Sequence, residues 1–307
     1  MRDLWTEKYR PKKVEDYVFT DDTTKEQVQQ WIVEKNIPHL LLYGPAGTGK
    51  TTLAKILINE LDIHDYDVMQ VNASRDNGVD FIKTKIEGFI STMPFGELKI
   101  VLLDEADYLS PNAQGLLRGL IEEYQAQARF ILTCNLVHKI IPPLKSRCYE
   151  LHINKTDQTE FTARAATVLV NESIAFDLET LDNYIKVTYP DLRKCLNLLQ
   201  SNSNTGTLLS PKDSASDSVD YKFALVDLIK AKKLRDARKL LCSQVRPEEM
   251  DELFRWCYDN LQLWSTTDEG QDEAILVIRK ALVNHSLVAD PEINISAMMV
   301  ELAQIEK

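Results

Sequence analysis

Residues 44–51 of this chain read Gly44-Pro45-Ala46-Gly47-Thr48-Gly49-Lys50-Thr51 and are the strongest signal of its fold. It fits the pattern G-x-x-x-x-G-K-[ST] of a phosphate-binding loop, in which the backbone N–H groups of a glycine-rich turn point at phosphate oxygens. Lys50 is then expected to reach the β- and γ-phosphates, and Thr51 to offer its hydroxyl to Mg²⁺. The alternative is a glycine-rich turn that binds nothing.

The flanks of this loop favour nucleotide triphosphate binding. Leu40–Tyr43 before it is a short apolar run typical of a buried strand, and Thr52–Leu61 after it has helical periodicity. The residues expected to contact the nucleotide here are Gly44, Gly47, Thr48, Gly49, Lys50, Thr51 and Thr52.

Short apolar runs alternate with helical patterns as far as Ile153. The expected strands are Leu40–Tyr43, Val68–Val71, Ile100–Asp104, Phe130–Cys134 and Tyr149–Ile153. The expected helices between them are Thr52–Leu61, Phe81–Ile90 and Gln114–Tyr124. This alternation predicts an α/β fold: a parallel sheet with helices on both faces and a ligand at the carboxyl ends of the strands.

The second half of the chain is helical by periodicity, beginning with Asp157–Asn171, Leu178–Lys186 and Asp191–Gln200. We therefore expect a nucleotide-binding domain at 1–153, a small all-α domain at 154–202, a polar linker at 203–218 and a second all-α domain at 219–307. Pro247-Glu248-Glu249 is expected to begin one of the last helices, with proline in the first turn and acids at the positive end of the dipole.

The composition is that of an ordinary globular protein, with 44% hydrophobic and 27% charged residues. A net charge of −11 argues against a free-standing DNA-binding protein but leaves room for DNA binding within an assembly. Five scattered cysteines without metal-ligand spacing predict reduced thiols in an intracellular protein. We expect no membrane span and no signal peptide.

Carboxylates follow the strand Ile100–Asp104. Asp104, expected beside the phosphate loop, can hold Mg²⁺, and Glu105 can polarise the water that attacks the γ-phosphate; the alternative is that these acids cap the next helix. Asn135 at the end of another strand can orient the same water, or it is a simple turn residue. Taken by spacing alone, Arg147 is a surface arginine.

The order of phosphate loop, Asp104-Glu105-Ala106-Asp107, Asn135 and Ser146-Arg147-Cys148 resembles the AAA+ ATPases. Within them it is similar to the clamp-loader branch, which holds the replication factor C small subunits and the ATPase subunit of tailed-phage clamp loaders. The resemblance implies an AAA+ domain followed by an all-α lid domain and an all-α collar domain. The collar region matches only in length and helicity.

The resemblance also assigns roles to residues. Arg147 corresponds to the arginine that reaches into the ATP site of the neighbouring subunit, and Arg193 to the arginine of the second-sensor helix. The segment from Ala113 to Tyr124 resembles the helix that couples DNA contact to the ATP site. The residues implied to line the adenine pocket are Thr6, Glu7, Lys8, Tyr9, Arg10, Pro11 and Val18.

The DNA contacts implied by the resemblance are to phosphates, with Arg75, Lys83 and Arg118 as candidates. The chain departs from the family pattern at two positions. Gly119 follows Arg118 where two adjacent arginines are usual, and Asn77 stands after the second strand where the family usually has an arginine. The segment from Pro190 to Lys194 is closer to the phage form, which favours a phage-type subunit.

The function implied is ATP-dependent loading of a sliding clamp onto primer–template DNA, with ATP and Mg²⁺ as cofactors. The implied partners are the other subunits of a hetero-oligomeric ring, expected to be pentameric, together with the sliding clamp and primer–template DNA. No membrane partner is expected. The expected location is the cytoplasm (host cytoplasm or nucleoid for a phage protein), or the nucleus in a eukaryote. Alternatives are another AAA+ motor, for branch migration or protein remodelling, and a scaffold that binds nucleotide without hydrolysing it.

Overall fold

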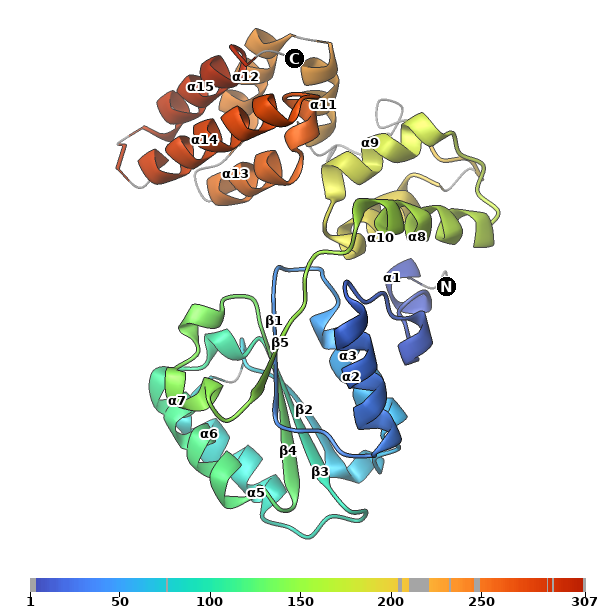
Figure 1. Ribbon diagram of the computed structural model, residues 1–307, viewed down its shortest axis with the longest axis vertical. Helices are drawn as coiled ribbons and strands as arrows, with labels where there is room; N and C mark the ends of the chain where they lie inside the picture. The colour runs from blue at the N-terminus through green and yellow to red at the C-terminus, as the bar shows by residue number, and fades with distance from the viewer. Residues whose placement is uncertain are drawn as a thin grey trace. The chain divides into compact units, whose positions relative to one another are not determined.

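The computed structural model describes residues 4–75, 77–203, 206–209, 221–231, 233–245, 249–285, 287–288 and 290–305. The chain divides into two compact units, Met1–Glu160 and Phe161–Lys307 (Figure 1). Most of the expected linker (204–205 and 210–218) and the expected helix start at Pro247 and Glu248 lie outside the described residues. The finer division of the second unit into lid and collar stays a prediction.

The first unit is built on a sheet of five parallel strands in the order β2-β3-β4-β1-β5 (Figure 1). The strands are β1 (Leu40–Tyr43), β2 (Val68–Asn72), β3 (Lys99–Asp104), β4 (Ala128–Cys134) and β5 (Tyr149–His152). The predicted parallel sheet is therefore confirmed, with strand ends that differ from the expected ones by one or two residues.

Side chains of β1 alternate between two apolar cores. Leu40 and Leu42 lie in the core shared with α2 (Asp22–Val33) and α3 (Lys50–Glu60), whereas Leu41 lies in the opposite one. Successive residues of a strand point to opposite faces, so a sheet covered on both sides needs apolar residues throughout. This requirement explains why the inner strands read as continuous apolar runs.

The remaining helices of the first unit lie at its N-terminus and on the second face of the sheet. They are α1 (Trp5–Lys8), α4 (Val79–Phe81), α5 (Glu87–Ile90), α6 (Pro111–Glu123) and α7 (Pro142–Lys145). A π-helical turn, Ile82–Ile86, joins α4 to α5, so the single helix expected at Phe81–Ile90 is interrupted. The helix α6 begins where Ser110 accepts a hydrogen bond from the Ala113 N–H and proline occupies the first turn.

The second unit is helical throughout its regular elements. Its helices are α8 (Gln158–Asn171), α9 (Leu178–Thr188), α10 (Leu192–Ser201), α11 (Tyr221–Lys230), α12 (Leu234–Gln244), α13 (Met250–Asp259), α14 (Asp268–His285) and α15 (Pro291–Leu302). The rings of Tyr184 on α9 and Phe223 on α11 meet edge to face, so helices of the two expected all-α domains pack together. No helix in the described part of the chain is long and apolar enough to cross a bilayer.

A histidine just before β1 ties the stability of the sheet to pH. His39 Nδ1 accepts the Phe130 N–H at 3.2 Å, which requires an unprotonated nitrogen. Burial, helped by the charge of Arg129, lowers the pKa of His39 to about 4. Between pH ~6.5, the ordinary histidine pKa, and pH ~4, the unfolded chain binds a proton that the native chain does not. The His39 contribution to stability is therefore present above this range and lost as pH falls through it.

We expect His39→Asn to remove this dependence. The difference in unfolding free energy between wild type and variant should shrink as pH falls from 6.5 to 4, by at most about 1.4 kcal/mol per pH unit. Denaturant unfolding at several pH values measures it, and His138→Asn, at an exposed position, is the control. Parallel curves for the His39 variant and wild type would contradict the assignment.

Candidate nucleotide-binding and ATPase site

The phosphate loop joins β1 to α3 and needs glycine at two positions for different reasons. A Cβ on Gly44 would lie 2.1 Å from the carbonyl oxygen of Ile153, so no side chain fits there. Gly49 has φ +91°, in the left-handed region that glycine adopts without strain. These two constraints hold the loop against the end of β5 and start α3 at Lys50.

Lys50 lies within the loop that it was predicted to serve. Its side chain is 7% exposed, and Nζ donates to the carbonyl oxygens of Gly44 at 3.0 Å and Pro45 at 2.6 Å. The ammonium group is thus a fixed positive charge inside the loop, where the motif expects phosphate. The Thr48 hydroxyl also donates to the Pro45 carbonyl, at 3.0 Å.

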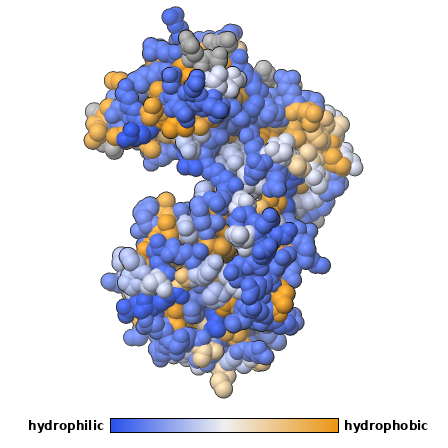
Figure 2. All heavy atoms as spheres, in the orientation of Figure 1, coloured by the Kyte–Doolittle hydropathy of each residue, from blue (hydrophilic) through white to orange (hydrophobic). Residues whose placement is uncertain are grey.

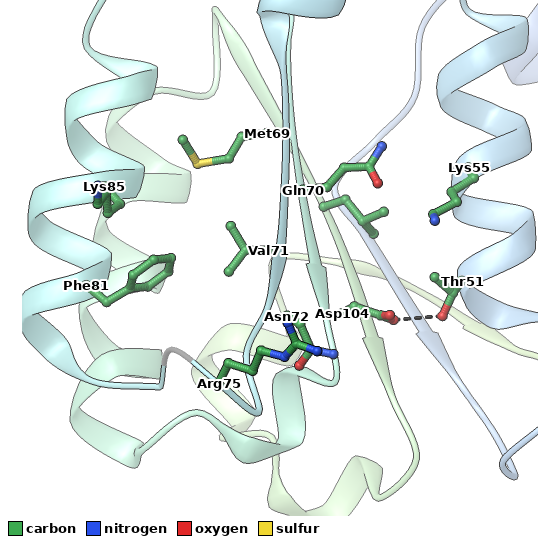
Figure 3. Close-up of a pocket in the computed structure, with 11 residues that line it drawn as sticks. Thr51, Lys55, Met69, Gln70, Val71, Asn72, Arg75, Phe81, Lys85 and Asp104 are labelled. Carbon is green, nitrogen blue, oxygen red and sulfur yellow. Dashed lines mark hydrogen bonds between the residues drawn. The ribbon is translucent and has the colours of Figure 1, made fainter.

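The carboxylate of Asp104 joins three elements of the site. Its Oδ1 accepts from the hydroxyl of Thr51 at 2.7 Å (Figure 3) and from the hydroxyl of Thr133 on β4 at 2.5 Å. The sequence predicted Thr51 and Asp104 but missed Thr133, which lies inside an apolar strand. The available signal was a single hydroxyl side chain among the apolar residues at the end of β4, where Thr133 is itself buried.

This donor set fits Mg²⁺. A hydroxyl and a carboxylate are hard oxygen ligands, and Mg²⁺ is usually held by one or two carboxylates together with phosphate oxygens and water. Within the described residues, no three His, Cys, Asp or Glu side chains gather as a self-sufficient metal site. Thr51 and Asp104 would supply two oxygen ligands to the ion, and a bound nucleotide and water would supply the others.

Glu105 follows Asp104 in a left-handed conformation, with φ +59° and ψ +44°. Such a conformation is uncommon for a residue with a side chain and is often found at functional sites. The Glu105 N–H donates to the Thr133 hydroxyl at 3.1 Å, so the same threonine fixes both acids. Glu105 is half-buried, as a residue that polarises water needs to be if solvent is to reach it.

Asn135 lies directly after β4, beside the phosphate loop. The neighbouring Cys134 carbonyl accepts the Gly44 N–H at 3.4 Å, and the Asn135 side chain is exposed. Asp107, a residue to which the sequence assigns no separate role, is 7% exposed and accepts the Leu136 N–H at 3.1 Å. This contact fixes the backbone on which Asn135 sits.

The N-terminal segment reaches the loop through Tyr17, another residue that the sequence did not single out. A Cβ on Gly49 would lie 3.2 Å from the Tyr17 ring, and the Tyr17 hydroxyl donates to the Thr48 carbonyl at 3.4 Å. Burial raises the pKa of Tyr17, so its hydroxyl stays protonated. The adjacent Val18 is half-buried.

The predicted adenine-pocket box begins in α1, and Glu7 of this helix forms an ion pair at 2.9 Å with Arg10, which follows the helix. The contact of Thr6, Glu7, Lys8, Tyr9, Arg10, Pro11 and Val18 with a nucleotide stays a prediction. Arg193 is exposed in the first turn of α10, in the second unit, and its role at the phosphate loop also stays a prediction.

The two cysteines of the first unit, Cys134 and Cys148, are not reactive thiolates. Burial raises the pKa of Cys134 to about 12, with Asp107 adding to the shift, and burial raises that of Cys148 to about 12. Both thiols are therefore protonated at neutral pH, which makes them packing residues rather than nucleophiles.

Arg147 lies at the amino ends of the strands, whereas the phosphate loop lies at their carboxyl ends. It precedes Tyr149, which pairs with Leu40 at the amino end of β1, while Gly44 follows the carboxyl end of the same strand. The four residues of β1 between them span roughly 13 Å at about 3.3 Å per residue. The hydrogen bonds of Arg147 run to Glu122 on α6, to the carbonyl of Pro143 and to the hydroxyl of Ser146, not to its own phosphate loop.

Two of the three DNA-contact candidates lie near the β2 edge of the sheet. Arg75 lines a cavity of about 540 Å³ around the edge strand β2, together with Lys55 and Lys85 (Figure 3). Lys83, on the same helical segment as Lys85, is exposed but does not line the cavity. The sequence thus missed Lys55 and Lys85 as companions of Arg75. Arg118 is exposed on α6.

A phosphate loop after β1, a carboxylate pair after β3 and a polar residue after β4 define a P-loop ATPase of the AAA class. In agreement, residues 40–157 match the ATPase family associated with various cellular activities (AAA).

Curated relatives narrow the class. The replication factor C small subunit of Sulfurisphaera tokodaii is 36% identical over 237 residues, which cover 76% of this chain and 69% of the relative. Replication factor C subunit 4 of Encephalitozoon cuniculi is 34% identical over 266 residues, 85% of this chain and 83% of the relative. The chain belongs to the replication factor C small-subunit family, and is accordingly a clamp-loader ATPase of DNA replication.

Solved structures agree on the fold. RuvB of Thermotoga maritima aligns with a TM-score of 0.57 over 80% of this chain and 88% of that chain, at 17% identity. A second RuvB structure, titled as a Holliday junction branch migration motor, gives 0.56 over 76% and 85%, at 16% identity. At these identities the likeness concerns the fold alone and does not favour the branch-migration alternative.

We expect Thr133→Val to uncouple the two acids from β4. Valine keeps the shape of the side chain but removes the hydroxyl that bonds Asp104 and Glu105. The ATPase kcat should fall about 10- to 100-fold, while nucleotide binding persists and stability falls by about 1 kcal/mol. Thr133→Ser, which restores the hydroxyl, should recover most of the rate; a serine variant as slow as the valine variant would contradict this role.

Proposed function

We propose that this chain is a ring subunit whose ATP site is completed by Arg147 of a neighbouring subunit. The observation that carries the proposal is the position of Arg147 at the amino edge of the sheet, away from its own phosphate loop. An arginine that cannot serve its own site is suited to serve an adjacent one. The membership of the chain in a family of clamp-loader subunits supports this assembly with neighbouring subunits.

The roles proposed for the site follow from its charges. Lys50 binds phosphate oxygens, and Thr51 and Asp104 would hold Mg²⁺, which neutralises phosphate charge when it is bound. Glu105 polarises the attacking water, and Asn135 orients it. The neighbour's Arg147 adds positive charge where negative charge develops on the γ-phosphate, a contribution of about 10³–10⁵ in kcat. Hydrolysis then depends on assembly, and serves to release the loaded clamp.

Apolar side chains on the last helices support assembly through the second unit. Exposed large apolar residues recur there, and the space-filling view shows apolar atoms over these helices (Figure 2). They are Leu276, Leu282 and Val283 on α14, Leu287 and Val288 between α14 and α15, and Ile293 and Val300 on α15. Large apolar residues that gather on a surface are typical of protein–protein contacts, so these helices are proposed as the collar.

An aromatic cluster at the amino ends of β2 and β3 supports a clamp-binding surface. Tyr66 and Phe95 are 73% and 76% exposed, and their ring centroids lie 5.6 Å apart; Met93 is 84% exposed. Two buried charges fix the loop that carries them: Asp67 accepts the N–H groups of Phe95 and Gly96, and Lys99 donates to the Phe89 carbonyl. A rigid exposed apolar loop is suited to dock on a protein.

The DNA contacts are proposed to be phosphate contacts by Arg75, Lys83 and Arg118, all exposed and without sequence preference. Five subunits per ring, a phage origin and a cytoplasmic location stay predictions. The test that separates a loader from another motor or a non-hydrolysing scaffold is ATP turnover with co-expressed partner subunits, with and without clamp and primed DNA. Stimulation by clamp and DNA together is expected; zero turnover in the full mixture would support the scaffold.

We expect Arg147→Ala to leave ATP affinity of the assembled ring nearly intact and to lower its kcat about 10³-fold or more. Steady-state ATPase and nucleotide-binding titrations of the ring measure the two effects. The control is Arg238→Ala in the second unit. Arg129→Ala is unsuitable because Arg129 lies in β4 and bonds the carbonyl of Ile37. Equal turnover of the Arg147 variant and wild-type rings would disprove the trans-acting arginine.

We expect Phe95→Ser to weaken clamp binding by about 10-fold or more, since apolar anchors at interface centres carry much of the affinity. Binding of the ring to a surface-immobilised clamp in the presence of ATP measures it. Val33→Ser, another exposed apolar position, is the matched control. A Phe95 variant that binds clamp as wild type does would place the clamp elsewhere.

A further inference from the structure

The last turn of α6 departs from the usual charge pattern of helices. Cations are favourable near the negative, C-terminal end of a helix dipole, and anions are not. This helix, Pro111–Glu123, ends on two acids, Glu122 and Glu123, and its last turn contains no basic residue. The position of Glu122 is therefore unfavourable by itself and calls for a cation from elsewhere in the fold.

The cation is Arg147. Its Nε donates to Glu122 Oε1 at 2.6 Å, and its Nη2 donates to the same oxygen. Its Nη1 donates to the carbonyl of Pro143 at 2.6 Å. The guanidinium is thus held on two sides, by the end of α6 and by α7, although its side chain remains 30% exposed.

We propose that Glu122 is the positioning residue for Arg147 in the assembled ring. The carboxylate fixes the side chain that the neighbouring ATP site uses, and so acts on a reaction that takes place in another subunit. This inference rests on the proposed trans role of Arg147. It adds the residue that gives the arginine its orientation and places that residue on α6.

The number of donors makes this arrangement compatible with phosphate binding. A guanidinium carries five N–H groups. Glu122 accepts one from Nε and one from Nη2, and the Pro143 carbonyl and the Ser146 hydroxyl accept from Nη1. The second N–H of Nη2 has no partner among the residues that the structure describes. Arg147 can therefore keep its bonds to Glu122 and Pro143 while it presents a remaining donor to phosphate. A long arginine side chain held in this way loses less freedom when it binds.

Fold stability is a poor explanation for the pair. Glu122 is 51% exposed, and ion pairs between exposed side chains contribute little to stability. The pair also joins residues that other contacts already bring together, since Gln114 on α6 accepts the Ile141 N–H and donates to the Lys139 carbonyl. Removal of the Glu122 carboxylate should therefore change the orientation of Arg147 and not the packing of α6.

The test is steady-state ATPase of the complete ring, with partner subunits, clamp and primed DNA. Glu122→Ala should lower kcat about 10- to 100-fold, the effect of a misplaced catalytic group, with KM for ATP, ring assembly and melting temperature unchanged. Glu122→Gln keeps an acceptor oxygen but loses the charge assistance, so it should fall between alanine and wild type. Glu123→Ala is the matched control and should turn over as wild type does.

A double variant separates positioning from an independent effect. Glu122→Ala combined with Arg147→Ala should be no slower than Arg147→Ala alone, because the carboxylate then has no arginine to orient. If Arg147→Ala is slow while Glu122→Ala matches Glu123→Ala, the positioning inference is wrong and the trans-acting arginine stands. If Arg147→Ala turns over normally, the proposed function itself fails.

Three other results would also overturn the inference. A faster Glu122→Ala ring would mean that the pair restrains Arg147 rather than presenting it. A raised KM with unchanged kcat would assign Glu122 to nucleotide binding. If the alanine ring does not assemble, Glu122→Gln decides, and an unchanged kcat in that ring overturns the role.

Discussion

The site depends on one oxygen atom. Asp104 Oδ1 accepts hydrogen bonds from a hydroxyl at the start of α3 and from one on β4, so the phosphate loop, the acidic strand and the strand that precedes Asn135 share a single anchor. The phosphate loop follows β1 and the two acids follow β3, and β4 lies between these strands in the sheet. Thr133 on β4 bonds the carboxylate of Asp104 and also accepts the backbone N–H of Glu105, so it fixes both acids beside the loop.

The parallel sheet places the nucleotide site and the proposed interaction surfaces at opposite ends of its strands. Its carboxyl edge carries the phosphate loop and the acids, whereas its amino edge carries Arg147 and the aromatic cluster of Tyr66, Met93 and Phe95. All strands point the same way, so each edge collects groups from several segments that are distant in the chain. One subunit therefore has a site on one edge and, by our proposal, surfaces that serve other molecules on the opposite edge.

Much of the first unit could be predicted from sequence because its signals are local. An apolar run, a glycine-rich turn and a helical period place β1, the loop and α3 within a residue or two. Thr133, Tyr17 and Asp107 could not be found this way, since each acts through a contact with a residue far along the chain. The helix expected at Phe81–Ile90 was right in extent, but its π-helical turn has no simple sequence signal.

The class of chemistry could be predicted from the sequence alone, because Gly49 takes a left-handed backbone that glycine adopts without strain, and Lys50 and the acidic pair carry the charges of the site. It also carried the family resemblance that the curated relatives confirm. Which groups meet could be seen only in the folded chain: Thr133 joins the two acids, Tyr17 packs against Gly49, and Glu122 binds Arg147. The physical reason is that hydrogen bonds and ion pairs act over a few ångströms in space, and the order of strands in the sheet, not their order in the chain, sets those distances.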